Sequence, residues 1–246
     1  MKLTILGCQG AYPANSQATT SYLLESDNYF LLIDFGSGAF QNLAKIMEPT
    51  DIHALILTHY HHDHIADVGV LQYAFQLKSS LENKSKKEFV IYGHNHSDEF
   101  NRLVMPTVNQ VEAYNPDEIL RVGPFKITFL KTIHPVVCYA LRIEDKHTKK
   151  SIVFTADSGY LADFITFARQ TDLLLADAMF LNGKENQSTH MSAQEVGKIA
   201  DLAQVKRVVL THLPPLYQDL LLEQAKEVIP DNIPVTLAKD FDEYII

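Results

Sequence analysis

The 246-residue chain has two cysteines, no tryptophan and no hydrophobic run of the roughly 20 residues that a membrane-spanning helix requires. Two thiols, Cys8 and Cys138, cannot form a disulfide framework, and residues 1–7 are too short and too soon interrupted for a signal peptide. We therefore expect a cytoplasmic protein without a membrane segment, in which each cysteine is a small buried side chain.

Positive charge is also scarce, because the chain has 21 lysines and arginines but 30 aspartates and glutamates, which gives a formal net charge of −9. Sequence-blind binding of nucleic acid depends on neutralising phosphates with basic side chains, so an extended nucleic acid is not an expected partner. A small anion remains compatible with this charge where bound metal ions supply the positive field.

No internal repeat, low-complexity tract or linker divides the chain, so we expect a single domain over residues 1–246. Apolar runs typical of strands alternate with segments of helical periodicity. The expected strands are 1–7, 20–26, 29–35, 53–57, 88–92, 108–114, 125–131, 136–143, 151–155, 172–176, 206–211, 234–238 and 243–246, and the expected helices are 39–47, 65–78, 161–169, 192–203 and 216–228. Residues 78–88 are polar and predict an exposed loop or helix end. This order indicates two stacked sheets flanked by helices.

The chain has eleven histidines, and four of them lie between positions 59 and 64, with an aspartate among them. This tract follows a short buried strand, and a tight turn there lets alternate side chains converge. We expect His59 and His61 to share one ion, and Asp63 and His64 to face a second. Imidazoles and carboxylates without thiolates suit Zn, Mn or Fe.

Three further candidate ligands each follow an apolar strand, namely His134, Asp157 and His212. Taken singly, each would more often be structural. Together with the histidine tract, they predict a site built at one edge of a sheet sandwich.

The order His59-x-His61-x-Asp63-His64, His134, Asp157, His212 resembles the metallo-β-lactamase superfamily over essentially the whole chain. The resemblance implies an α+β fold, the αββα four-layer sandwich, and a two-metal hydrolase. It also implies that His59, His61 and His134 hold one ion, that Asp63, His64 and His212 hold the other, and that Asp157 bridges them. Asp34 matches the early aspartate of that family, which implies a residue that orients the histidine loop.

A narrower resemblance lies in Thr189-His190-Met191-Ser192, before a helix with the capping-box pair Ser192 and Glu195. This element resembles the ribonuclease Z branch, which implies that His190 assists chemistry at a scissile phosphate. Asp177 stands where that branch has a glutamate that pairs with the histidine, so pairing of Asp177 with His190 stays open. No insertion resembles the Gly- and Lys-rich arm that grips transfer RNA, which favours a small or cyclic phosphodiester or a short nucleic acid.

We therefore predict a dinuclear hydrolase with two divalent ions, zinc first and Mn or Fe as alternatives, in which a metal-bridging water is deprotonated near neutral pH. Asp63 is expected to accept a proton from that water, and His190 to donate one to a phosphoryl or leaving oxygen. A lactonase or β-lactamase-like hydrolase, a transfer RNA 3′-processing endonuclease and a non-hydrolytic metal or redox protein are the alternatives. A homodimer is an open alternative to a monomer, and the roles of His94, His96 and Tyr160 are open.

Overall fold

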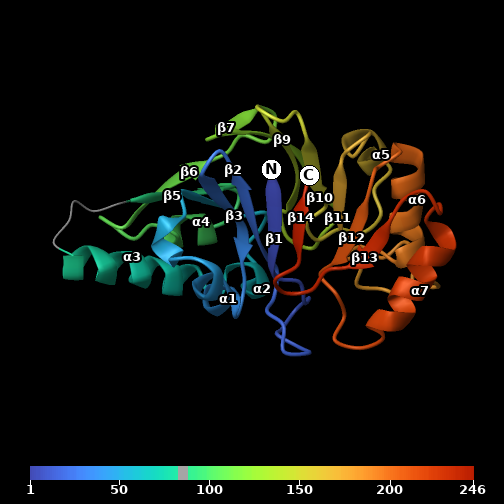
Figure 1. Ribbon diagram of the computed structural model, residues 1–246, viewed down its shortest axis with the longest axis horizontal. Helices are drawn as coiled ribbons and strands as arrows, with labels where there is room; N and C mark the ends of the chain where they lie inside the picture. The colour runs from blue at the N-terminus through green and yellow to red at the C-terminus, as the bar shows by residue number, and fades with distance from the viewer. Residues whose placement is uncertain (83–87) are drawn as a thin grey trace.

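The computed structural model describes residues 1–82 and 88–246, and it places two facing β-sheets between outer layers of helices (Figure 1). The first sheet has the strand order β14-β1-β2-β3-β4-β5-β6 and the second has the order β13-β12-β11-β10-β9-β8-β7. The strands of the first sheet are β1 (Lys2–Gly7), β2 (Ser21–Ser26), β3 (Tyr29–Phe35), β4 (Ala54–Ile56), β5 (Phe89–Gly93), β6 (Asn109–Ala113) and β14 (Glu243–Ile245). Those of the second are β7 (Leu120–Val122), β8 (Phe125–Lys131), β9 (Tyr139–Asp145), β10 (Ser151–Phe154), β11 (Leu173–Asp177), β12 (Val208–Thr211) and β13 (Val235–Leu237).

Helices cover the outer face of each sheet, which confirms the predicted αββα sandwich (Figure 1). The N-terminal half contributes α1 (Ala39–Ile46), the 3₁₀ turn η1 (Pro49–Asp51), α2 (His62–Ile65), α3 (Val68–Glu82) and α4 (Glu99–Arg102). The C-terminal half contributes α5 (Asp163–Phe167), α6 (Ala193–Ala203) and α7 (Gln218–Val228). Side chains of β3 alternate between the two hydrophobic cores: Leu31 and Ile33 face the second sheet, whereas Leu32 and Phe35 face the outer helices. A strand buried on both faces explains the unbroken apolar run that predicted it.

The direction of the strands determines where the functional side chains lie. Strands β3, β4, β5 and β6 are mutually parallel, and so are β10, β11, β12 and β13. The carboxyl ends of parallel strands meet at one edge of a sheet. Residues that follow β4, β10 and β12, namely His59, Asp157 and His212, are therefore brought to neighbouring edges of the sandwich.

The structure corrects the predicted helix over residues 65–78. The helix begins three residues later, at Val68 of α3, and Ile65 instead ends the short helix α2. Asp67 lies in the turn between the two helices, where its N–H donates to the Phe35 carbonyl and its carboxylate accepts from Phe40 N–H. Helix α3 then continues to Glu82, into the polar segment 78–88. Residues 83–87 of that segment lie outside the described residues. The short elements β7 and α4 had no expected counterpart.

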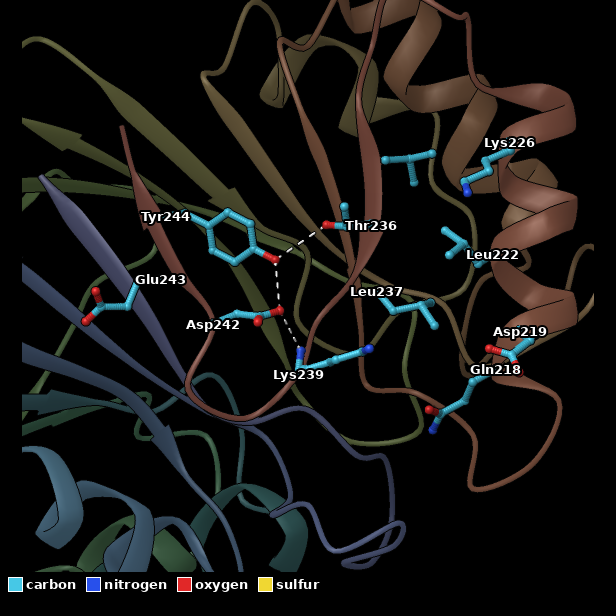
Figure 2. A pocket seen from close by; sticks show the side chains of 11 residues that line it. Gln218, Asp219, Leu222, Lys226, Thr236, Leu237, Lys239, Asp242, Glu243 and Tyr244 are labelled. Atoms are coloured by element: carbon cyan, nitrogen blue, oxygen red, sulfur yellow. Dashed lines mark hydrogen bonds between the residues drawn. The ribbon is translucent and has the colours of Figure 1, made fainter.

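The two sheet edges formed by β13 and β14 lie beside α7 and enclose an open groove of about 650 Å³ (Figure 2). Its lining is both polar and apolar and carries charges of both signs, with Lys226 and Asp219 on α7 and Lys239 bonded to Asp242. Tyr244 donates a hydrogen bond to Asp242 and contacts Thr236 across the groove. None of the predicted metal ligands lines this groove. Among the described residues, no helix has the length and apolar character to cross a membrane.

Candidate metal centre

The structure brings all seven predicted ligands together, in two adjacent groups that share Asp157. One group comprises His59, His61, His134 and Asp157, and the other comprises Asp63, His64, Asp157 and His212. Within each group the candidate ligand atoms lie within 4.8 Å of one another. This grouping is the one that the family resemblance implied, with Asp157 in the bridging place.

The first group converges on the Nδ1 atom of His61, the residue before α2. This atom lies 3.1 Å from Nε2 of His59, after β4, and 3.1 Å from Nε2 of His134, after β8. Asp157 Oδ2 lies 3.7 Å from Nε2 of His59 and 3.8 Å from Nε2 of His134. Ligands at about 2.0–2.1 Å from a tetrahedral zinc ion are roughly 3.3 Å apart, so these nitrogens have the spacing of a shared ion.

The second group surrounds the other side of Asp157. Nε2 of His212 lies 3.1 Å from Asp63 Oδ2 and 3.3 Å from Asp157 Oδ2. Nε2 of His64 lies 3.2 Å from Asp157 Oδ1 and 3.6 Å from Asp63 Oδ2. Both His64 Nε2 and Asp157 Oδ1 are buried, and neither has a hydrogen-bond partner among the described residues. Buried polar atoms are ordinarily hydrogen-bonded, so two such atoms 3.2 Å apart with no hydrogen bond have the character of metal ligands.

Asp34, the residue that the resemblance implied as an orienting group, is fully buried near the end of β3 in a left-handed conformation with φ 52°. Its carboxylate accepts hydrogen bonds from Thr58 N–H at 2.8 Å and from His64 Nδ1 at 2.7 Å. With its proton on Nδ1, the imidazole of His64 can ligate through Nε2. His134 is oriented likewise, since its Nδ1 lies 3.1 Å from the Thr189 carbonyl and must donate to it.

The imidazoles and carboxylates of the centre stabilise one another's charged forms. Burial disfavours a charged imidazole, but Asp157 and Asp34 outweigh it and raise the pKa of His64 well above its ordinary value. Burial also opposes ionisation of Asp157, yet His212 and His64 hold the pKa of that carboxyl well below its ordinary value. A cation that binds here must displace the proton of His64, so metal uptake should release a proton.

His190 and Asp177 form a pair beside the centre, which answers the question that the sequence left open. His190 Nδ1 lies 2.8 Å from Asp177 Oδ2, and the imidazole stacks on His212 with ring centroids 4.9 Å apart. Asp177, His190, His212 and Asp157 also lie within 4.8 Å of one another. Asp177 is one methylene shorter than a glutamate but still reaches His190. It does so because Phe180 pairs with residues 191–193 through backbone hydrogen bonds, which hold the chain at His190 against the end of β11. Although burial opposes it, Asp177 raises the pKa of His190 to about 9.

A backbone contact at the centre could not be read from the sequence. Ala11, in the loop after β1, donates its N–H to Asp63 Oδ2 at 3.0 Å. Three non-glycine residues of this loop, Ala11, Asn15 and Ser16, have positive φ angles. A side chain at Gly10 would place its Cβ 2.8 Å from the His212 ring, so only glycine lets the loop approach.

Three residues whose roles were open lie outside the two ligand groups. His94 is buried, with its ring 4.5 Å from that of Tyr60, and burial lowers its pKa to about 4. His96 is exposed. Tyr160 packs beneath the ammonium group of Lys198, 4.7 Å from the ring centroid, which indicates a packing role.

Known proteins place the chain in a family. A beta-lactamase superfamily domain matches residues 29–213. The chain is 44% identical to the probable metallo-hydrolase YhfI of Bacillus subtilis, over 97% of each protein. The crystal structure of that metallo-beta-lactamase fold protein has a TM-score of 0.94 at 42% identity and covers 99% of this chain and 98% of its own. Ribonuclease Z of Haloferax volcanii is 23% identical, over 93% of this chain and 90% of that protein. The chain therefore belongs to the beta-lactamase superfamily and is a metallo-hydrolase with the metallo-beta-lactamase fold.

Proposed function

We propose that this chain is a dinuclear phosphodiesterase that hydrolyses a small or cyclic phosphodiester. The observation that carries the proposal is the His190–Asp177 pair, which lies against the two ligand groups and stacks on His212. A protonated imidazole held there can donate to a leaving oxygen or to a phosphoryl oxygen.

The residues present fit two divalent cations, with His59, His61 and His134 for one, Asp63, His64 and His212 for the other, and Asp157 for both. Zinc is the proposed metal because imidazole nitrogens dominate the donor set, and Mn or Fe are the alternatives. When bound, such ions activate water and offset the negative charge of a phosphoryl group. Asp63 and Asp157 neutralise only part of the charge of two dications, so the loaded centre attracts an anion.

Two side chains are proposed to move protons. Asp63 takes the proton of the attacking water at its carboxylate, which Ala11 N–H holds in place. His190 keeps Nδ1 on Asp177 and offers Nε2 to the leaving oxygen. Asp177 is itself held by Ser158 N–H at 3.1 Å, so the pair has a fixed orientation.

Exposed apolar side chains that lie near His134 and His212 in the sequence favour a substrate with an apolar part. Ile133 and Val136, beside His134, are exposed, as are Leu216 and Tyr217 in the segment after β12. Exposed apolar side chains beside a polar site commonly bind the uncharged part of a ligand.

An extended nucleic acid is disfavoured on two grounds. The net charge is −9. The alignment with the ribonuclease Z of H. volcanii runs over 291 positions, more than the 246 residues of this chain, so that protein has segments that this chain lacks.

The test is a turnover screen of the metal-free protein reconstituted separately with zinc and manganese. Its substrates are cyclic nucleotides, cyclic sugar phosphates, linear dinucleotides, bis-p-nitrophenyl phosphate, a lactone, a β-lactam and a precursor transfer RNA. We expect hydrolysis of at least one small phosphodiester and little or no turnover of the lactone and β-lactam. Efficient turnover of a lactone or β-lactam with no phosphodiester cleaved would overturn the proposal, and accurate 3′ cleavage of the precursor alone would overturn the small-substrate assignment.

A further inference from the structure

Thr58, the residue directly before His59, connects the candidate metal centre to Asp34. Its hydroxyl donates to Asp34 Oδ2 at 2.8 Å and lies 3.1 Å from Nδ1 of His59. Thr58, His59 and Asp34 are all fully buried. We propose that Thr58 is a positioning residue, which sets the tautomer of His59 and joins both ligand groups to the one carboxylate of Asp34.

The count of protons selects one arrangement. The Thr58 hydroxyl has one proton, which it gives to Asp34, so it can only accept from His59. His59 must then carry its proton on Nδ1, which leaves the lone pair of Nε2 directed at His61 and the other ligand atoms. If Thr58 instead donated to His59, the proton of that imidazole would be on Nε2, where it would block a cation.

Asp34 thereby holds one ligand of each group. It binds His64 of the second group directly through Oδ2, and it holds His59 of the first group through the Thr58 hydroxyl on the same oxygen. Partners of this kind tune metal affinity through the orientation and basicity of the ligand. Loss of the Thr58 hydroxyl should therefore lower the affinity of the first group for its ion and leave His64 hydrogen-bonded to Asp34.

Cys138 is the competing partner for the same nitrogen, because its Sγ lies 3.6 Å from Nδ1 of His59. Sulfur is a weaker hydrogen-bond acceptor than a hydroxyl oxygen that is itself polarised by a carboxylate. The hydroxyl at 3.1 Å is the shorter contact, so we assign orientation of His59 to Thr58 and packing to Cys138.

The experiment measures zinc affinity by competition with a chromophoric chelator, in the full chain carrying T58V, T58S or C138A. T58V keeps the shape of the side chain and removes the hydroxyl, so we expect one of two zinc ions to bind about 10–100-fold more weakly. T58S should restore affinity to within about threefold, and C138A should stay near the wild type; T58A replaces T58V if the valine variant does not fold.

The matched control is T171V, because Thr171 is equally buried and its hydroxyl binds Ser151 at the opposite ends of β10 and β11. We expect T171V to keep both ions. Unchanged zinc binding in T58V, failure of T58S to restore it, or an equal loss in T171V would each overturn the proposal. Weakening by C138A without weakening by T58V would assign the role to Cys138 and overturn it too.

This inference rests on the proposed metal centre but not on the proposed substrate. Long-range ¹⁵N–¹H correlation spectra of the imidazoles separate the two, since they report the His59 tautomer with or without zinc. We expect the proton on Nδ1 in the wild type and in T58S, and a mixture of tautomers in T58V. A proton on Nε2 in the wild type would refute the role of Thr58, whereas absence of zinc uptake with the Nδ1 tautomer intact would refute the metal centre alone.

Discussion

Replacing His190 with alanine removes the imidazole that faces the two ligand groups from the Asp177 side. No predicted ligand is lost, so we expect metal content to stay near two ions per chain. The substitution leaves the buried Asp177 carboxylate with the Ser158 amide as its remaining hydrogen-bond donor. Loss of one partner of a buried polar pair costs about 1–3 kcal/mol of unfolding free energy, which a folded protein of this size tolerates.

The catalytic effect should be larger than the effect on stability. A positioned proton donor contributes about 10²–10⁴-fold in rate, which is about 3–5 kcal/mol of activation free energy. We expect kcat for a phosphodiester to fall by that factor and KM to change little, because the donated proton matters most in the transition state. The assay compares p-nitrophenyl esters with alkyl esters, and the alkyl esters should suffer more because a poor leaving group needs the proton.

The dependence on pH follows from the same pair. Asp177 raises the pKa of His190 to about 9 in the metal-free protein, and two nearby cations lower it. A general acid works below its pKa, so kcat of the metal-loaded enzyme should fall as pH rises through the lowered pKa of His190, below 9. Asp177→Asn removes the stabilising charge and should move this decline to lower pH.

The control for the histidine substitution is His147→Ala, since His147 is half-exposed and pairs with Asp27 away from the centre. Its kcat should match that of the wild type. Unchanged kcat in His190→Ala on every phosphodiester would refute the assignment of His190 as the acid. An equal loss for all leaving groups would instead indicate that it stabilises the phosphoryl oxygens.

Four further outcomes are expected. Asp157→Ala should lose most activity and reduce the content of both metals, measured by plasma emission spectrometry, and full occupancy of both sites would contradict a shared carboxylate. Zinc at a thousand times its dissociation constant should stabilise the fold by about 4 kcal/mol, so a chelator should lower the Tm, and an unchanged Tm would contradict a site formed only in the folded state. Phe154→Ala, which empties a buried position whose ring packs against Tyr22 at 5.0 Å, should cost about 3–5 kcal/mol in urea denaturation, and a loss below 1 kcal/mol would contradict the packing. Precursor transfer RNA should bind weakly in a filter assay, and tight, salt-sensitive binding would contradict the small-substrate assignment.

The fold was largely predictable because its strands have buried apolar runs and its helices have clear periodicity. The capping box at Ser192 marked the start of α6, and the structure contains both of its hydrogen bonds. The exception over residues 65–78 arose at Asp67, where a turn is held by contacts to Phe35 and Phe40. Those contacts join segments about thirty positions apart, so local periodicity carries no trace of them.

The sequence by itself determined the candidate ligands and their order, because one turn after β4 holds a histidine tract and three more candidates each follow a strand. It also determined the family, since that order resembles a known pattern. Only the tertiary structure decided the contacts between segments that meet at the sheet edges: the reach of Asp177 to His190, the Ala11 amide on Asp63, and the Thr58 hydroxyl between Asp34 and His59. Spacing along a chain determines which side chains can share a turn. Strand register and the path of the loops determine which donor of a distant residue hydrogen-bonds to which oxygen. Register and loop path are set only when the two sheets pack together.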